Sequence, residues 1–234
     1  MPQEFVEKLK VFPYEIVKTR ANKNINSSLN SHPDILVHGL PNGDIICDRD
    51  NFSYYRDKFK GRQLYMTEKS LGDAYENHVY LNAFFYENYL VGNLKLLDKN
   101  LLNFYRQRNF MLINVKQGYS KCSSLVTNKF IATSDMGIYK ALKDKINVIK
   151  INHKEIILKD YPYGFIGGAS GFIDNNLILT GNLGKHSSGY LIENECQKEK
   201  LKILELGQNF LEDFGSILLI WKNLSNLEIN IFLW

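Results

Sequence analysis

The sequence predicts a single α/β domain in which about five similar units follow one another and close into a ring. Three observations lead to this prediction. Pairs of short apolar segments, each separated by a turn, recur at intervals of about 40–50 residues. A helical pattern follows most of these pairs, and a further β-type segment follows each helix. The chain has 234 residues, so it can bury a core without disulfides or metals.

The repeated hairpins are the first elements of the units. Asn or Gly at their turns supplies the positive φ that tight hairpins need. In the four complete copies, the first strand, turn and second strand are residues 34–37, 41–43 and 44–47; 79–85, 87–88 and 89–92; 124–126, 127–129 and 130–133; and 171–173, 174–176 and 177–180. A degenerate fifth copy starts at residues 215–220 and returns as residues 227–231.

Polar residues mark where the helices begin. Asp50, Asp98 and Asp135 each precede apolar residues spaced three or four apart, and such a side chain can accept hydrogen bonds from the first helix amides. A weaker helical pattern covers residues 186–198 in the fourth unit. The strands that end the first four units are expected at residues 63–66, 110–113, 146–149 and 201–204.

These elements divide one domain, residues 1–234, into five units. The expected units are residues 31–70, 71–117, 118–160, 161–207 and 208–234. The last unit lacks a third strand, and we expect the strand-like segment 13–17 near the N-terminus to supply it and close the ring. Residues 223–234 are apolar but irregular for a last strand. Four-stranded propeller blades have a similar repeat length, but they contain no helix.

Composition argues against several classes of function. The net charge is only +4 and the lysines are scattered, whereas a nucleic-acid-binding protein gathers its basic residues on one face. No run of 18 apolar residues is present, so we expect no membrane span. The three cysteines, Cys47, Cys122 and Cys196, have neither metal-ligand spacing nor a disulfide framework. We therefore expect a cytoplasmic protein with reduced thiols and with no metal or cofactor.

Two glycine-containing segments, residues 164–171 and 211–217, lead into the fourth and fifth repeats. Together with the repeat pattern, they make the chain resemble the pentein superfamily. This superfamily comprises the α/β propellers of arginine and agmatine deiminases, dimethylargininases and amidinotransferases, and the chain is most similar to an uncharacterised bacterial branch of it. The resemblance covers nearly the whole chain. It implies five pseudo-symmetric ββαβ units around a central pocket, into which the first strand of each unit directs side chains.

The resemblance also implies a catalytic set, and this sequence departs from it. Pentein enzymes use a Cys nucleophile from the fifth unit, a His from the fourth, and carboxylates that bind the planar guanidinium. Leu218 and Leu219 stand where the Cys is expected, and residues 165–173 contain neither His nor an acid. Residues 120–123, Ser-Lys-Cys-Ser, replace a Glu-Gly-Gly-Asp type motif in the third unit. The departures predict a pseudoenzyme that has lost guanidine hydrolysis.

Small and polar residues at the expected pocket positions are candidates for ligand binding. Glycines at a strand start allow a ligand to approach the backbone closely, and they equally suit the crowding of five units around one axis. Asp213 can hold a cationic ligand or cap the turn beside it. The predicted ligand-binding residues are Asp34, Asn82, Ser123, Gly167, Gly168, Ser170, Asp213 and Ser216.

Three residues are candidates for a rearranged catalytic site. Cys122 needs a nearby base or cation to lower its pKa, and strand alternation predicts that Lys121 points to the opposite face. His32 and His78 begin the first strands of units one and two, where either can act as a base in the pocket. The alternatives are a buried structural thiol and two histidines that hydrogen-bond at strand entrances.

Three functions are consistent with these patterns. The first is binding of a small guanidino or amino-acid-like ligand in the central pocket by a catalytically degenerate pentein, whose pocket has no nucleophile hydrogen-bonded to a base. The second is a guanidine-modifying hydrolase or transferase in which Cys122 works with His32 or His78, so these side chains should converge. The third is a protein-interaction module without enzymatic activity, with a filled pocket and a contiguous outer patch.

Overall fold

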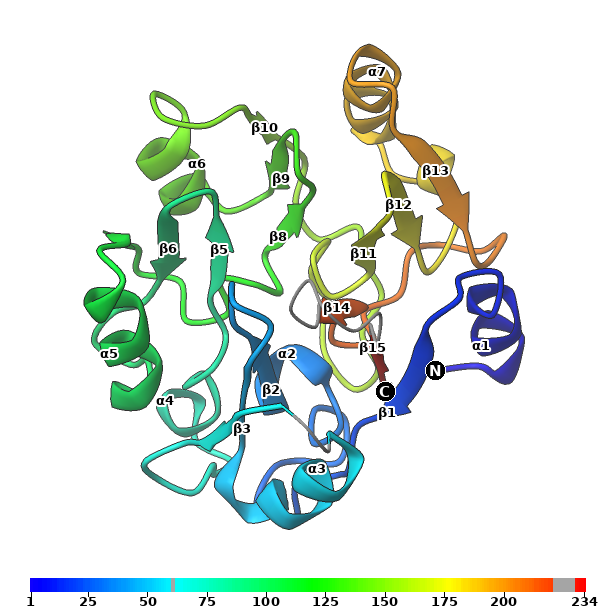
Figure 1. The fold of residues 1–234 in the computed structure, drawn as a ribbon. Helices are drawn as coiled ribbons and strands as arrows, with labels where there is room; N and C mark the ends of the chain where they lie inside the picture. The colour runs from blue at the N-terminus through cyan, green and yellow to red at the C-terminus, as the bar shows by residue number, and fades with distance from the viewer. Residues whose placement is uncertain (60–61, 221–229) are drawn as a thin grey trace.

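The computed structural model describes residues 1–59, 62–220 and 230–234. Five three-stranded sheets stand around a common centre, and most helices lie on the outside, whereas the short helix α2 (Pro33–Leu36) lies toward the centre (Figure 1). In the first four sheets an inner strand pairs antiparallel with a middle strand, which pairs parallel with an outer strand. These strands are β2 (Val37–Gly39), β3 (Ile45–Cys47) and β4 (Leu64–Met66); β5 (Phe84–Tyr86), β6 (Tyr89–Gly92) and β7 (Met111–Asn114); β8 (Ser124–Val126), β9 (Ile131–Thr133) and β10 (Val148–Lys150); and β11 (Ser170–Ile173), β12 (Asn176–Leu179) and β13 (Lys202–Glu205). The predicted fold class, a ring of α/β units, is confirmed.

The fifth sheet joins the two ends of the chain. Its strands are β14 (Leu218–Ile220), β15 (Asn230–Leu233) and β1 (Glu15–Lys18). β15 pairs antiparallel with β14 and parallel with β1, so an N-terminal strand occupies the place that the outer strand has in the other sheets. The return strand expected at residues 227–231 lies outside the described residues over 227–229, as does part of the segment 223–234.

The helices occupy the connections between the strands. They are α1 (Gln3–Leu9), α2 (Pro33–Leu36), the short 3-10 helix η1 (Arg49–Asn51), α3 (Phe52–Lys58), α4 (Tyr75–His78), α5 (Lys99–Gln107), α6 (Met136–Leu142), the 3-10 helix η2 (Leu183–Lys185) and α7 (Gly189–Lys198). Asp98 accepts hydrogen bonds from the amides of Asn100 and Leu101, and Asp135 accepts one from the amide of Ile138. These two side chains begin their helices as predicted. α3 begins after η1 without a side-chain cap.

The hairpin turns use left-handed backbone at polar residues and glycine. Gly43 has φ 84° between β2 and β3, and Glu87 has φ 51° between β5 and β6. Asp174 and Asn175 both have positive φ between β11 and β12, as a two-residue hairpin turn requires. These short turns fix the register of each hairpin and hold each inner strand toward the centre of the ring.

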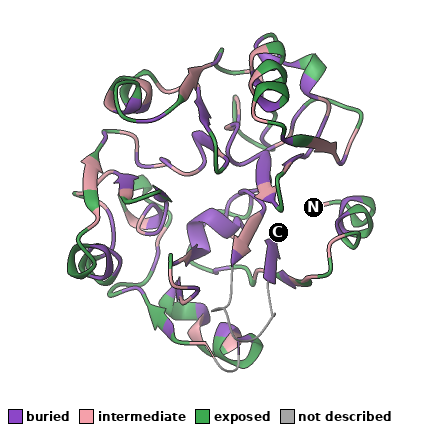
Figure 2. Cartoon of the chain, turned by 45° about the horizontal axis from the view of Figure 1, so that its top comes forward, coloured by how far each residue is buried: buried purple, intermediate pink, exposed green. Residues whose placement is uncertain are grey.

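Apolar residues fill the space between neighbouring units. Ile46 of β3, Leu90 of β6 and Leu101 of α5, for example, belong to one buried cluster that joins the first two units. Full burial of one such side chain contributes about 1.5–3 kcal/mol relative to exposure. Figure 2 shows that burial is greatest toward the centre, on inner and middle strands, and that the outer faces of the helices are exposed; the outer strands β4, β7, β10 and β13 are mostly intermediate or exposed. The inner strands are therefore held rigidly, which positions the segments that precede them.

Several of the expected strands begin later than predicted, among them β14, which starts at Leu218 and not at residue 215, and β10, which starts at Val148 and not at residue 146. Residues 34–36 lie in α2 and the strand starts only at Val37, because Pro33 fixes the backbone at the first helical position. In the second unit, the strand expected at residues 79–85 is confined to β5, and a turn in which the Asn82 amide bonds the Val79 carbonyl comes before it. The polar residues that precede these inner strands thus lie in a short helix, as Asp34 does, or in a turn, as Asn82 does.

Candidate functional site

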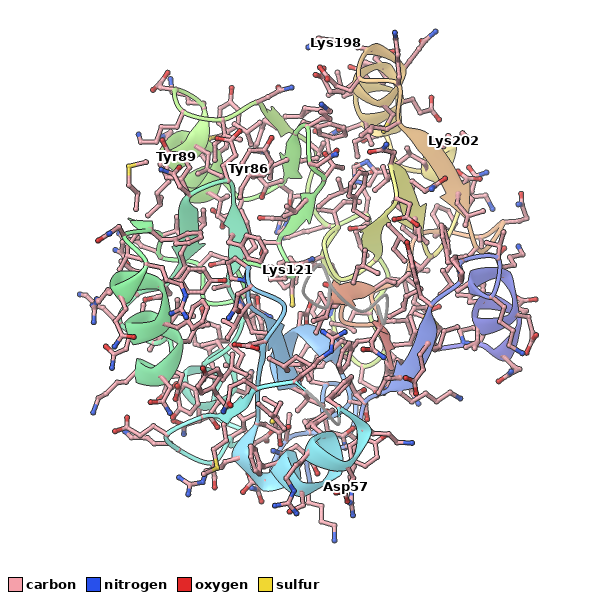
Figure 3. The ribbon with its side chains drawn as sticks, viewed as in Figure 1. Asp57, Tyr86, Tyr89, Lys121, Lys198 and Lys202 are labelled. Carbon is pink, nitrogen blue, oxygen red and sulfur yellow. The ribbon has the colours of Figure 1, made fainter. Side chains whose placement is uncertain are left out.

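The segments that precede the inner strands meet near the middle of the ring, where five side chains form what we call the central network. Its members are Asp34, Asn82, Lys121, Cys122 and Ser216. Figure 3 shows Lys121 near the middle of the ring of sheets. The network unites four of the five units, so residues far apart in the sequence contact one another there.

Asn82 anchors the network through both ends of its amide. Its Nδ2 donates to the Asp34 carbonyl oxygen and to the Cys122 Sγ, each at 3.0 Å. Its Oδ1 accepts from the backbone amides of Lys121 at 2.8 Å and Cys122 at 3.2 Å. All four partners would lose a hydrogen bond without this side chain, so Asn82 fixes the turn that carries Lys121 and Cys122.

Asp34 is the buried acid of the network. Its Oδ2 lies 2.6 Å from the Ser216 Oγ and 3.0 Å from the Cys122 Sγ, both of which can donate to it. Its Oδ1 is buried without a hydrogen-bond partner among the described residues. Burial raises the pKa of Asp34, with the charge of Asp213 acting in the same direction and those of His32 and Lys121 opposing it.

Ser216 connects the acid to the amine. Its Oγ accepts from Lys121 Nζ at 3.1 Å and can donate either to Asp34 or to the Gly167 carbonyl oxygen at 2.8 Å. Ser216 has φ 75°, a conformation that costs a non-glycine residue about 1–3 kcal/mol. Such strain often marks a residue whose position matters to a site.

Cys122 remains a protonated thiol in this environment. Burial raises its pKa well above the ordinary value, and the charges of Asp34 and Asp213 raise it further. The strand alternation assumed for Lys121 and Cys122 is wrong, because residues 120–123 form a turn; both side chains enter the central network, through different partners. The amine is close, yet it bonds Ser216 and leaves the thiol to Asp34 and Asn82.

Gly167 and Gly168 pack directly against neighbouring units. A Cβ at Gly167 would lie 2.2–2.6 Å from the carbonyl oxygens of Lys121, Ser124 and Cys122. A Cβ at Gly168 would lie 1.9 Å from Asp213 Oδ1. The structure therefore explains both glycines by the crowding of units three, four and five, which was the alternative to a ligand role.

A first cavity, the strand cavity, lies among the inner strands and has a volume of about 390 Å³. Residues from all five inner strands line it, and most of its wall is apolar. Asp34, Lys121, Ser170 and His38 add polar groups. His38 is already hydrogen-bonded to the Leu81 carbonyl and the Tyr105 hydroxyl, and burial lowers its pKa to about 4.

A second cavity, the turn cavity, has a volume of about 210 Å³ and shares no lining residue with the first. Its wall comes from the turns that precede the inner strands. Lys121 lines the strand cavity and its neighbour Cys122 lines the turn cavity, so the central network separates the two. The lining residues of the turn cavity are Leu29, His32, Ile35, Tyr119, Cys122, Leu158, Tyr161, Pro162, Tyr163, Phe165 and Asp213.

Asp213 and His32 are the titratable groups that the turn cavity adds to Cys122. Asp213 accepts from the amides of Gly215 and Phe165, each at 2.9 Å, and its Oδ1 lies 3.8 Å from His32 Nδ1. Burial raises the pKa of Asp213 to about 6, an effect that the two amides oppose, whereas burial lowers the pKa of His32 to about 4. At neutral pH the pair is thus a carboxylate beside a neutral imidazole whose Nε2 is buried without a hydrogen-bond partner among the described residues.

The remaining predicted residues lie near the network. Ser170 lines the strand cavity. Ser123 is buried, and its Oγ has no hydrogen-bond partner in the described part of the chain. His78 hydrogen-bonds the Tyr119 hydroxyl and the Gly72 carbonyl oxygen, so the structure brings His32, but not His78, to the cavity that Cys122 lines.

Sequence reasoning missed the aromatic lining of the turn cavity. Tyr161, Tyr163 and Phe165 come from one short loop, and Tyr119 comes from the preceding unit. The ring of Phe165 lies 5.9 Å from that of Tyr119 and 6.0 Å from that of Tyr163, so the rings form a continuous wall. The alternation of aromatic residues at 161, 163 and 165, just before the glycine segment, was the available signal.

Neither a membrane helix nor a metal centre is found in the residues that the structure describes. Within 1–59, 62–220 and 230–234, no helix has the length and apolar character needed to cross a bilayer. The same ranges hold no group of three or more His, Cys, Asp or Glu side chains suited to a metal ion.

Comparison with known proteins shows to which family the chain belongs. A model of the DUF6873 family, described as a family of unknown function, matches residues 1–218. The chain belongs to this family. No protein with a curated description matches the sequence of this DUF6873 member.

Solved structures show which fold this family member has. It is similar to the dimethylarginine dimethylaminohydrolase DDAH from Pseudomonas aeruginosa, solved with citrulline, at a TM-score of 0.57 and 8% sequence identity over 87% of this chain and 78% of that one. A second dimethylarginine dimethylaminohydrolase, solved as an adduct with 4-chloro-2-hydroxymethylpyridine, matches at a TM-score of 0.55 and 8% identity, covering 87% and 80% of the two chains. The pentein resemblance is confirmed, and the chain represents a branch of that fold without an assigned activity.

Proposed function

We propose that this protein binds a small organic cation of the guanidinium or ammonium class in the turn cavity and does not cleave it. The observation that carries the proposal is a buried carboxylate, Asp213, in a cavity of about 210 Å³ to whose wall four Tyr and Phe rings contribute. The ligand class agrees with the pentein fold, whose enzymes act on guanidino compounds.

The aromatic wall suits a cation. The faces of Tyr and Phe rings carry a negative quadrupole and attract a cation within about 6 Å by about 0.5–2 kcal/mol. Tyr119, Tyr163 and Phe165 supply neighbouring rings, and Tyr161 adds a partly exposed ring on the same cavity. A carboxylate at one side and rings at the other hold a planar or tetrahedral cation between them.

The charge balance of the cavity supports the same ligand class. With a pKa of about 6, Asp213 is ionised at neutral pH, while His32, with a pKa of about 4, carries no charge. The charge of Lys121 opposes the rise in the pKa of Asp213, but its amine bonds Ser216 and makes no ion pair with Asp213 within the described residues. A buried anion without a close cation is costly, and a cationic ligand would remove that cost.

The same cavity lacks an activated nucleophile. The Cys122 thiol is held protonated, and it donates to Asp34 instead of to a histidine. The resemblance to pentein enzymes implies a Cys from the fifth unit, and Leu218 and Leu219 form strand β14 there. We therefore expect binding without hydrolysis.

The two alternative functions have less support. A rearranged hydrolase needs Cys122 and His32 to interact directly. Both residues line the turn cavity, but the Cys122 Sγ hydrogen-bonds Asp34 and Asn82 instead. An interaction module needs a contiguous apolar surface, and exposed residues such as Met66, Tyr190 and Phe210 come from three different units. A protein partner and a cytoplasmic location stay predictions from the sequence.

A thermal-shift comparison of matched ligands tests the proposal. Ethylguanidinium and ethylurea have nearly the same shape but differ in charge, so we expect only the cation to raise the melting temperature in a saturable way. Ligand at 100 times its dissociation constant stabilises the fold by about 2.7 kcal/mol, which is a shift of several degrees. Mass spectrometry after overnight incubation should find the guanidine intact. Equal shifts with both compounds, or none in a protein that melts cooperatively, would overturn the proposal.

A further inference from the structure

The strand cavity contains an amine that cation binding in the turn cavity does not use. Lys121 is half-buried and lines this cavity, where most of the surrounding wall is apolar. Ala83, Phe84, Val126 and Phe172 are among the apolar residues of that wall. A lysine at such a place is removed from most of the water that normally stabilises its charge.

A relay of hydrogen bonds leads from this amine to a buried acid. Lys121 Nζ lies 3.1 Å from Ser216 Oγ, and Ser216 Oγ lies 2.6 Å from Asp34 Oδ2. Asp34 lines the same cavity, and its second carboxyl oxygen has no hydrogen-bond partner in the described ranges. The order amine, hydroxyl, carboxyl lets a proton pass from Lys121 to Asp34 through Ser216.

We propose that Lys121 is a nucleophilic amine that forms an imine with the aldehyde or ketone group of a mostly apolar molecule held in the strand cavity. Three features support this: Lys121 lines the cavity, the relay can take the proton of its amine, and the volume of about 390 Å³ accommodates a small carbonyl compound. Burial lowers the pKa of Lys121, although Asp34, Cys122 and Asp213 oppose the change. A lowered pKa increases the share of free amine, which is the nucleophilic form.

The proposed reaction balances with the groups present. The Lys121 ammonium first gives a proton through Ser216 to Asp34, leaving a free amine and a carboxylic acid. The nitrogen lone pair attacks the carbonyl carbon, and the amine proton moves to the oxygen to give a carbinolamine. Asp34 then returns its proton through Ser216 to the carbinolamine hydroxyl, which leaves as water. The product is an iminium cation on Lys121 beside the Asp34 carboxylate.

The charges around the cavity favour a neutral carbonyl compound over an anion. Asp34 lines the cavity at its centre, and Glu87 lines it at an exposed position. A ligand carboxylate would meet both of these acids, whereas an uncharged aldehyde or ketone meets no such repulsion. The apolar wall then binds the rest of the molecule.

Reductive trapping in the full-length protein tests the inference. We would incubate the protein with benzaldehyde and sodium cyanoborohydride at pH 7 and follow benzylation of each lysine by peptide mass spectrometry. Lys116 is the matched control, since it is exposed and lies five residues from Lys121. We expect Lys121 to react about tenfold faster than Lys116, because burial lowers the pKa of Lys121 and the relay through Ser216 can accept its proton. A rate at Lys121 equal to or below that at Lys116 would overturn the inference.

Protection and variants separate the site from general reactivity. Benzyl alcohol has the shape of benzaldehyde without its carbonyl, so an excess should slow labelling of Lys121 and leave Lys116 unchanged. Ser216→Gly relieves the positive φ and removes the relay, and labelling of Lys121 should fall at least tenfold while the melting curve stays cooperative. Ethylguanidinium should not protect Lys121, because its proposed site is the turn cavity. Labelling unaffected by both benzyl alcohol and Ser216→Gly would contradict an imine site here.

Discussion

The strand cavity and the turn cavity lie on two sides of one network, but their walls come from different kinds of backbone. Paired strands supply most of the strand cavity, and its wall is mainly apolar. Turns before those strands supply the turn cavity, which gathers a carboxylate, an imidazole, a thiol and four aromatic rings. Strand register repeats around the ring, so strand positions vary little in character. Turns are free of that register and can differ from unit to unit, which makes them suitable for specific chemistry.

The same comparison applies within the fifth unit. Leu218 and Leu219 belong to β14 and contribute apolar surface to the strand cavity. Asp213, five residues earlier, belongs to a turn and faces the other cavity. A side-chain change at these two strand positions therefore alters the strand cavity and not the wall that carries the carboxylate.

The largest expected effect comes from breaking the wall between the cavities. Gly167→Ala would place a Cβ within 2.6 Å of three carbonyl oxygens, so we expect it to lower the free energy of unfolding by about 3 kcal/mol or more. Gly184→Ala is the control, because its nearest neighbour is the end of the Asn182 side chain at 3.0 Å; it should stay within about 1 kcal/mol of the wild type. Urea denaturation measures both. Equal stability of the two variants would show that the units are not packed through Gly167.

A smaller effect, the pH dependence of ethylguanidinium affinity, should distinguish the two cavities. The turn cavity needs the Asp213 carboxylate, and burial sets the pKa of this group at about 6. Lys121 and Glu212 are the other charged groups that act on it, and His32 stays neutral above a pKa of about 4. Ethylguanidinium affinity should be constant above about pH 7 and fall about tenfold per pH unit below about pH 6.

The raised pKa of Asp213 also determines whether the unliganded protein gains or loses stability as the pH rises. Because the pKa of Asp213 is higher in the folded state than its ordinary value, the folded chain binds more protons between about pH 4 and about pH 6. The contribution of this residue to stability is therefore lost as the pH rises through that window.

Calorimetric titrations of ethylguanidinium at pH 5, 6, 7 and 8 test the pH dependence of binding. An affinity independent of pH would contradict a role for Asp213.

The repeat pattern predicted the fold because its signals are local. Asn175 and Gly43 adopt the positive φ that their residue types suggested, and Asp98 and Asp135 cap helices as expected. The network was predicted in part for the same reason. Asp34, Asn82 and Ser216 precede inner strands, and a ring must bring such positions together.

The parts that were missed depend on contacts between units. Strand alternation was assumed for Lys121 and Cys122, but three hydrogen bonds to Asn82, from another unit, hold that segment as a turn. The aromatic wall joins Tyr119 to a loop more than 40 residues later in the sequence. Local sequence periodicity does not predict this contact, because tertiary packing decides which distant segments come together.

Calorimetric titration of ethylguanidinium into two variants tests most directly whether the cation is held in the turn cavity. Tyr163→Ala removes a ring of the turn cavity, and Val126→Phe adds volume inside the strand cavity. We predict that Tyr163→Ala weakens binding about fivefold, equivalent to about 1 kcal/mol of cation–π attraction, and that Val126→Phe leaves the affinity within about twofold of the wild type. Loss of affinity in Val126→Phe with full affinity in Tyr163→Ala would place the ligand in the strand cavity and contradict the account.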